Sequence, residues 1–187
     1  MHALVETEKG SLTSGAVVLA AGSWSGTIDV EGVAARAPVR PVRGQLLSLA
    51  WPGAPPRRVL WSDRCYLVPW DDGTVLVGAT AEEAGFDERA TVAGVRDLLD
   101  AACDLVPHAW TAGFNGARVG LRPATPDGLP IIGRSRVLPN LMYATGHFRN
   151  GVLLAPLTAQ LVADALLEDR VDPLIDDRFS PARFGDL

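Results

Sequence analysis

The chain has 187 residues, of which 48% are apolar and 21% charged, a balance typical of a soluble globular protein with a sizeable core. Its net charge of −5 argues against nucleic-acid binding, which needs a basic face. We expect no membrane partner either, because we find no apolar run as long as a membrane span.

The cysteine and histidine content indicates a reduced compartment and no metal site. Cys65 and Cys103 are far apart and form no CxxC motif. The three histidines are scattered, without the spacing of metal ligands. The opening stretch, "MHALVETEKG", lacks the apolar core of a signal peptide. We therefore expect a cytoplasmic protein.

The first part of the chain predicts strand, turn and strand. Residues His2–Glu8 mix apolar and polar side chains, and the turn is expected within Lys9–Gly15. Ala16–Ala21 is a short run of apolar residues only, which is typical of a strand buried on both faces. The run ends in "AAGSWSG", where Gly22 allows either a close approach to a ligand or a plain turn.

The composition then changes to Val, Leu, Trp and Pro, with turn residues between short apolar runs. "WDDGTV" is a hairpin signal, because an Asp-Gly pair tolerates the positive φ of a tight turn. We expect a largely antiparallel sheet. Its predicted strands are Val39–Ala50, Arg58–Trp61, Tyr66–Trp70, Val75–Thr80 and Gly113–Arg122.

One amphipathic helix is expected within the same region, in "TVAGVRDLLDAACDLVP". Thr91 is a suitable N-cap and Pro107 a suitable stop. The side chains predicted to face the core are Val95, Leu98, Leu99, Ala102, Leu105 and Val106.

Two short buried strands and a long apolar helix are predicted towards the end of the chain. The strands are Ile131–Ile132 and Leu141–Ala144, and the helix is Gly151–Leu167. Because the helix is apolar on most sides, we expect it to be buried. The tail, "DPLIDDRFSPARFGDL", is predicted to be an extended arm with a short turn.

Together these elements predict an α+β chain, in which an antiparallel-sheet domain interrupts pieces of an α/β domain. The predicted boundaries are 1–37 and 123–170 for the interrupted domain, 38–122 for the inserted one and 171–187 for a C-terminal arm.

Three residues carry candidate binding chemistry: Tyr66 in "CYLVP", Arg122 in "GLRPATPDGLPIIG" and Arg149 in "GHFRNG". Arg can bind a planar carboxylate through two hydrogen bonds, and Tyr adds a neutral donor. Arg122 has only Asp127 as an acid close in sequence, so its partner is either a ligand carboxylate or a distant acid of the fold. Arg149 precedes a helix start, where an anion or an electron-rich ring is favoured; an ordinary surface Arg is the alternative.

Five stretches together resemble the D-amino-acid oxidase family of flavoproteins, and within it the glycine oxidases of thiamine biosynthesis. They are "VVLAAGSWSG", "PVRPVRGQLLSL", "CYLVPWDDGTVLVGAT", "GLRPATPDGLPIIG" and "ATGHFRNGVLLAP". The resemblance covers about residues 1–170. It implies an FAD cofactor, held noncovalently because the "GLRP" stretch has no cysteine of the kind to which related sarcosine oxidases attach flavin.

The resemblance also implies roles for individual residues. Arg122 would hold the substrate carboxylate with help from Tyr66, and Arg149 would lie beside the flavin and the substrate. No side-chain acid or base is implied, because hydride passes from the substrate α-carbon to the flavin. The residues implied at the FAD site are Ala20, Ala21, Gly22, Trp24, Gly146, His147, Phe148, Arg149, Asn150, Gly151, Val152 and Leu153.

The sequence departs from the family pattern in two places. The dinucleotide fingerprint GxGxxG is not found, so we expect this chain to correspond to the C-terminal portion of such an enzyme. Residues 1–37 and 123–170 would then be parts of an incomplete FAD-binding domain, and 38–122 the substrate-binding domain. Ala81 stands after "GAT", where glycine oxidases can carry a larger residue, so a roomier pocket is implied.

Three functions stay open at this point. The favoured one is oxidation of a small amino acid or amine to an imine or oxo acid, with release of ammonia or amine and hydrogen peroxide. The second is that of a D-amino-acid dehydrogenase or a sarcosine oxidase relative. The third is that of an inactive fragment that binds a small ligand or a protein partner. Apolar strand edges left open by missing neighbours would also favour a homo-oligomer.

Overall fold

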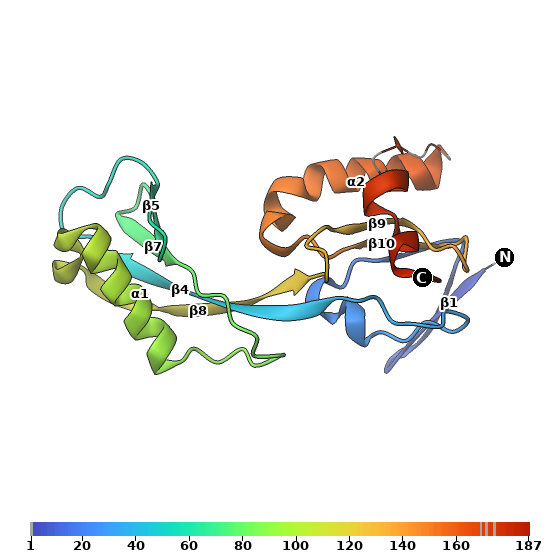
Figure 1. The fold of residues 1–187 in the computed structure, drawn as a ribbon, viewed down its shortest axis with the longest axis horizontal. Coiled ribbons are helices and arrows are strands. Elements are labelled where there is room, and N and C mark those ends of the chain that lie inside the picture. The colour runs from blue at the N-terminus through green and yellow to red at the C-terminus, as the bar shows by residue number, and fades with distance from the viewer. Residues whose placement is uncertain (1, 169, 171, 174) are drawn as a thin grey trace. The chain divides into compact units, whose positions relative to one another are not determined.

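The structure of the protein is a computed structural model that describes residues 2–168, 170, 172–173 and 175–187. The chain divides into two compact units, which we call unit 1 (Met1–Pro41 and Arg122–Leu187) and unit 2 (Val42–Leu121) (Figure 1). Helices and antiparallel pairs together confirm the α+β class. The cofactor-binding and substrate-binding roles of the domains stay predictions.

Unit 2 is built around a five-stranded sheet with the strand order β5-β6-β7-β4-β8. The predicted hairpin is confirmed: Gly73 has φ of 85°, and the Asp72 carboxylate accepts a hydrogen bond from the Thr74 amide at 2.8 Å. This turn sets the register in which Tyr66 lies opposite Gly78. The strands are β4 (Arg40–Ala50), β5 (Leu60–Trp61), β6 (Tyr66–Pro69), β7 (Thr74–Gly78) and β8 (Gly113–Ala124).

Helix α1 (Val92–Leu105) packs against this sheet through the predicted apolar face. The predicted cap is confirmed, because Thr91 Oγ1 accepts a hydrogen bond from the Gly94 amide at 3.1 Å. A 3₁₀ turn, η2 (Pro107–Thr111), follows where the helix was predicted to stop. Leu98 and Ala102 are buried in a core shared with the strands, and the other four predicted positions are partly buried against it.

Unit 1 contains a three-stranded sheet in the order β3 (Val17–Leu19), β10 (Leu141–Thr145) and β9 (Ile131–Arg134). Strand β3 runs parallel to β10, and β9 runs antiparallel to it. The two predicted C-terminal strands are confirmed, and their side chains fill the core. That core contains Leu19, Ala37, Val39, Ile131, Leu141, Tyr143 and Leu187.

The beginning of unit 1 differs from the prediction. The segment expected as a turn is mostly a strand, because β1 (Ala3–Thr7) and β2 (Gly10–Ser14) form a hairpin. The reversal is tight, since Gly10 has φ of 125° and the Thr7 hydroxyl donates to its carbonyl at 2.8 Å. The strand expected over Ala16–Ala21 is shorter, and Val18 on it is 39% exposed, so it is not buried on both faces.

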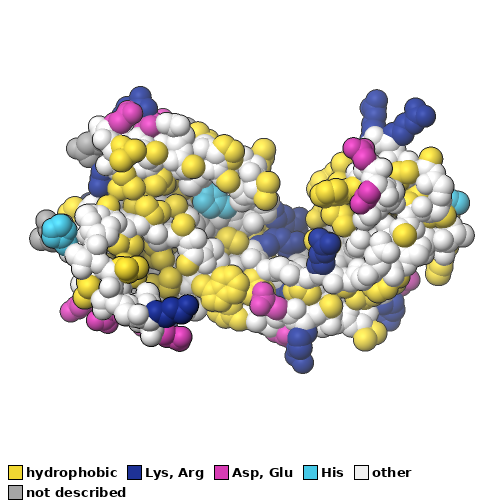
Figure 2. Space-filling view, turned by 180° about the vertical axis from the view of Figure 1, so that it is seen from behind, with side chains coloured by type: hydrophobic (Ala, Val, Ile, Leu, Met, Phe, Trp, Pro, Cys, Tyr) yellow, Lys and Arg dark blue, Asp and Glu magenta, His cyan; other side chains and the backbone are white. Residues whose placement is uncertain are grey.

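Helix α2 (Gly151–Leu167) is not buried as predicted. Val152 is 95% exposed and Leu153 is 78% exposed, and hydrophobic side chains show on the surface of this region in Figure 2. Only Thr158, Leu161 and Ala165 are buried, because one stripe of the helix faces the strands and the tail.

The expectation that no run is as long as a membrane span is also wrong. The helical segment Phe148–Leu167 has 20 residues and is apolar enough to cross a membrane by length and composition alone. A core helix of a soluble protein has the same two properties, so the segment is weak grounds for a membrane role.

The tail is not the predicted extended arm. It contains two short helical turns, η4 (Ile175–Phe179) and η5 (Pro181–Phe184), and it ends with a fully buried Leu187. The Leu187 carbonyl accepts a hydrogen bond from the Arg136 amide at 2.7 Å. The tail is therefore part of the core of unit 1.

Candidate functional site

Two turns that lie more than a hundred residues apart in sequence meet at one edge of unit 1. Parallel strands place their carboxyl ends at the same edge of a sheet, and β3 and β10 are parallel. Strand β3 leads into the 3₁₀ turn η1 (Gly22–Thr27), and β10 leads through Gly146 towards α2. The segments predicted around Ala20–Trp24 and Gly146–Leu153 therefore come together.

Thr145 joins these two turns directly. Its hydroxyl donates to the carbonyl of Gly22 at 3.1 Å and lies 2.8 Å from the hydroxyl of Ser25. Since a hydroxyl has a single proton, Ser25 is the donor in the second contact. Both side chains are buried. This pair was not predicted from the sequence, although Thr145 ends the apolar strand β10 and Ser25 lies in the turn after β3.

Gly146 makes the turn after β10 possible. Its φ is 79°, and a Cβ atom at this position would lie 2.6 Å from Cγ2 of Thr125. Any side chain here therefore meets both backbone strain and a packing clash. The chain continues through the 3₁₀ turn η3 (Phe148–Asn150), where Phe148 has φ of 49°, into α2.

His147 ties this turn to the helix that follows. Its Nε2 lies 2.9 Å from the hydroxyl of Thr158, which is one of the buried side chains of α2. Burial lowers the pKa of His147, so the ring is neutral near pH 7. The predicted contact of His147 with FAD stays a prediction.

The start of α2 offers polar and apolar groups side by side. The N-cap residue Asn150 makes no side-chain hydrogen bond to the helix, and no acidic side chain stands in its first turn. The guanidinium of Arg149 is exposed and lies 5.6 Å from the centre of the Phe148 ring. Val152 and Leu153 are exposed next to it. Such an edge suits a planar, electron-rich ring system with a partly apolar face.

The structure changes the argument for Arg122 as a carboxylate anchor. Arg122 lies near the end of β8, half-buried, and it is not without a partner in the structure. The neighbouring acid, Asp127, is held by Arg183 at 2.7 Å, and the Arg183 hydrogen bond lowers the pKa of the Asp127 carboxyl. Asp127 is therefore paired elsewhere, and the choice between a ligand carboxylate and a distant acid of the fold as the partner of Arg122 stays open, as does its role as an anchor.

Tyr66 belongs to unit 2 and is fixed there from two sides. Its ring lies over Gly78, where a Cβ atom would come within 2.4 Å of the ring carbon Cζ. The ring centre of Trp61 lies 4.9 Å from that of Tyr66. The tyrosine is half-buried, and its predicted contact with substrate stays a prediction.

Other features of the surface do not coincide with the predicted residues. A cavity of about 370 Å³ in unit 1 is lined by Arg134, Arg136, Met142 and Ile175 among others, none of them predicted. We place the candidate site at the glycine turns because the buried hydroxyl pair, the exposed Arg149 guanidinium and the exposed apolar side chains all lie at these turns. In the described part of the chain, no group of His, Cys, Asp and Glu could hold a metal ion.

The family described as FAD dependent oxidoreductase matches residues 2–165. A bifunctional protein ThiO/ThiG from Nostoc sp. is 42% identical over 91% of this chain and 26% of its own length. The glycine oxidase of Bacillus subtilis is 33% identical over 90% of this chain and 45% of its own length. The chain thus spans about a quarter of the first relative and under half of the second.

Two solved structures of oxidases are also similar to this chain. The glycine oxidase of Geobacillus kaustophilus has a TM-score of 0.87 and 35% identity, covering 95% of this chain and 48% of that one. The iminodiacetate oxidase of Chelativorans sp. BNC1 has a TM-score of 0.85 and 30% identity, covering 97% of this chain and 52% of that one.

Proposed function

Because the chain belongs to the family of FAD-dependent oxidoreductases, we propose that it acts as the substrate-binding unit and part of the FAD-binding unit of a glycine oxidase-like enzyme. The reaction would oxidise a small amino acid or amine to an imine, which hydrolyses with release of ammonia or amine while oxygen is reduced to hydrogen peroxide. The observation that carries this proposal is the meeting of the two glycine turns through Thr145.

The residues at this edge fit the flavin ring of FAD. Gly22 has φ of 55° and open space where a Cβ atom would stand, so a ligand can approach its backbone closely. The apolar side chains of Val152 and Leu153 provide surface for a ring to cover, which would account for their exposure. When bound, FAD would take up the hydride that leaves the substrate.

The substrate would be held by its carboxylate. We propose Arg122 as the bidentate partner of that group and Tyr66 as a neutral donor. Arg149 would place a positive charge at the start of α2, where the free helix amides add to it. These residues bind and orient the substrate, and none of them needs to accept a proton during the reaction.

A chimaera tests the proposal. The matched portion of the Geobacillus kaustophilus glycine oxidase would be replaced by this chain, and the remainder of that enzyme would be kept unchanged. We expect a yellow protein that releases hydrogen peroxide with glycine or a related small amine. A folded chimaera that binds FAD but oxidises none of a panel of small amino acids and amines would contradict the proposal. The parent enzyme is the positive control.

A further inference from the structure

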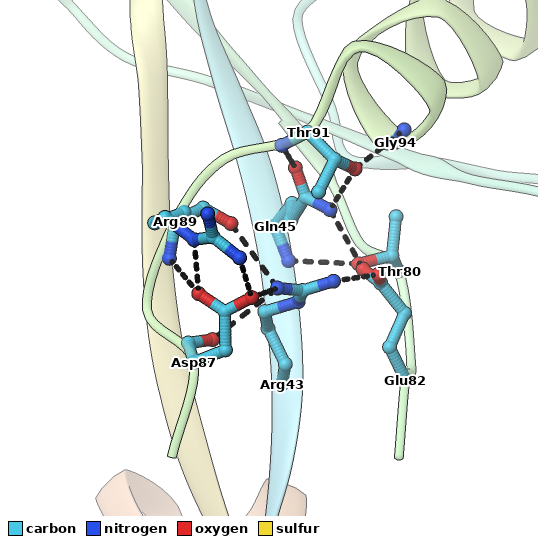
Figure 3. A network of polar contacts seen from close by, with 8 residues as sticks. All are labelled: Arg43, Gln45, Thr80, Glu82, Asp87, Arg89, Thr91 and Gly94. Atoms are coloured by element: carbon cyan, nitrogen blue, oxygen red, sulfur yellow. Dashed lines mark hydrogen bonds and ion pairs between the residues drawn. The ribbon is translucent and has the colours of Figure 1, made fainter. Parts of the chain in front are cut away.

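Unit 2 contains a network of polar side chains that joins β4 to the segment after β7 and to the start of α1 (Figure 3). Within it, Arg43 is 6% exposed and Gln45 is fully buried. Buried charges and amides are costly unless their partners are in place, so this network depends on its geometry. Its members are Arg43, Gln45, Thr80, Glu82, Asp87, Arg89, Thr91 and Gly94. We call it the β4 clamp.

Arg43 holds two points of the segment after β7. Its Nη2 lies 2.7 Å from Glu82 Oε2, and its Nη1 lies 3.0 Å from Asp87 Oδ2. Nη1 also lies 3.3 Å from each of the carbonyls of Asp87 and Arg89. One guanidinium therefore fixes residues 82 and 87–89 against β4.

Gln45 connects the same segment to the helix. Its Nε2 donates to Glu82 Oε1 at 2.8 Å and to Thr91 Oγ1 at 2.9 Å, while its Oε1 accepts from the Thr91 amide at 2.8 Å. Thr91 is the N-cap of α1, so the helix begins on this side chain. Gly94 permits the close approach, because a Cβ atom there would lie 2.3 Å from Gln45 Nε2.

The β4 clamp lies directly beside the residue on which Tyr66 rests. The chain leaves β7 at Gly78, under the Tyr66 ring, and continues to pair with β4 at residues 80 and 82. The Thr80 hydroxyl accepts from the Gln45 amide at 2.9 Å, and Glu82 and Arg43 exchange two backbone hydrogen bonds of 2.9 Å. Gly78 lies two residues before Thr80 and four residues before Glu82. Its position therefore depends on Gln45 and Arg43, which hold those two residues by hydrogen bonds.

We propose that Arg43 and Gln45 are positioning residues that hold segment 79–91 in place and thereby fix Tyr66 for substrate binding. This inference rests on the proposed function for the substrate contact of Tyr66. Neither side chain needs to touch substrate. Arg43 acts through Glu82 and Asp87, and Gln45 acts through Glu82 and Thr91. Together they keep the wall next to Tyr66 in one arrangement.

The first test uses the chain itself and Gln45→Glu. The new carboxylate would face Glu82 Oε1 across the present 2.8 Å contact and would lose the donor to Thr91. We expect hydrogen-exchange protection of residues 79–91 to fall about tenfold or more at about pH 8, with strands β9 and β10 unchanged. The NMR signals of the Tyr66 ring should shift. The double variant Gln45→Glu/Glu82→Gln keeps the same number of charges and should restore both signals.

Gln160→Glu is the matched control. Gln160 also donates to a carboxylate, Asp164 Oδ1 at 2.6 Å, but it lies exposed on α2 in unit 1. It should leave residues 79–91 and the Tyr66 ring unchanged. Unchanged Tyr66 signals in Gln45→Glu, or an equal effect of Gln160→Glu, would overturn the inference.

The second test uses the chimaera with glycine. Gln45→Glu should raise KM about fivefold or more while kcat changes less than about twofold, and the added Glu82→Gln should reverse the change. A shifted Tyr66 ring without any change in KM would overturn the positioning role and leave the proposed function standing. A chimaera without turnover would overturn the proposed function, and the first test would still decide whether the β4 clamp fixes Tyr66.

Discussion

The glycine turns of unit 1 are joined by neutral hydroxyls, whereas the segment after β7 in unit 2 is held by charged groups. Thr145 and Ser25 need no ion to stay buried. The β4 clamp instead sets Arg43 between two carboxylates. Neutral hydrogen bonds keep their strength over a wide pH range, while ion pairs lose theirs when a partner is protonated. The two candidate binding regions should therefore respond differently to substitution and to acid.

Gly146 offers the largest expected effect on the unit 1 turns. Gly146→Ala would combine a φ of 79° with the contact to Thr125, and should lower the free energy of unfolding by about 3 kcal/mol. Urea denaturation measures the loss. Gly128→Ala is the matched control, since its φ is 74° but nothing lies within 4 Å of the added carbon. Equal losses for the two variants would show that packing against Thr125 contributes nothing.

A second prediction compares the two side chains proposed to bind the substrate carboxylate. In the chimaera, Arg122→Ala should lower kcat/KM for glycine by about a hundredfold, because a charged bidentate partner is lost. Tyr66→Phe should lower it by about tenfold, since a neutral donor contributes less and the ring still packs over Gly78. A change below about threefold for Arg122→Ala would contradict its assignment. Equal losses would contradict the division of roles.

The hydroxyl pair should show a smaller effect. Thr145→Val keeps the shape of the side chain but removes the contacts to Gly22 and Ser25, and should cost about 1–2 kcal/mol of stability. The exposed Thr27→Val removes one hydrogen bond to the Trp24 carbonyl and should cost about 0.5 kcal/mol or less. Chemical denaturation of both variants checks the difference. A neutral Thr145→Val would mean that the two turns meet without this pair.

When the solution is acidified, the two regions should begin to lose stability at different pH values. Burial raises the pKa of Glu82, but hydrogen bonds from Thr80, Arg43 and Gln45 outweigh it, so the folded pKa lies below its ordinary value. The stability that Glu82 contributes is therefore present above about pH 4.5 and lost as pH falls through the lower folded pKa.

As pH falls, the stability that His147 contributes should begin to drop before the stability that Glu82 contributes. Its pKa is also lowered in the folded chain, so the unfolded state binds the proton first and stability falls as pH drops below about 6.5. Denaturation curves from pH 8 to 4 measure this slope. His147→Gln should remove the part of the slope that begins near pH 6.5 and leave the part below about pH 4.5 intact. An unchanged slope would contradict the burial of a neutral imidazole.

Local signals in the sequence predicted the parts of the fold that local chemistry determines. The turn at Asp72 and Gly73, and the cap at Thr91, depend on residues within a few positions of each other, and both are confirmed. The exposure of α2 could not be predicted in this way. The sequence of an apolar helix shows how much apolar surface the helix carries. It does not show which neighbouring elements cover that surface.

The polar part of the candidate site was predicted incompletely for a related reason. Thr145 meets Ser25 from 120 residues away, and Arg43 meets Glu82 from 39 residues away. Neither pair has a spacing signal, because the contacts arise only when separate strands are placed next to each other. The glycines on either side were found because their backbone requirements are local.

The burial of Leu187 has a practical consequence for anyone who purifies the protein. Its side chain is fully buried in unit 1, and its carbonyl is hydrogen-bonded to the Arg136 amide. An affinity tag or fluorescent reporter joined at that residue would have to pull it out of the core or thread past the tail. The hairpin of β1 and β2 exposes Leu4 at 60% and Leu12 at 65%, so the amino-terminal side tolerates such a fusion far better.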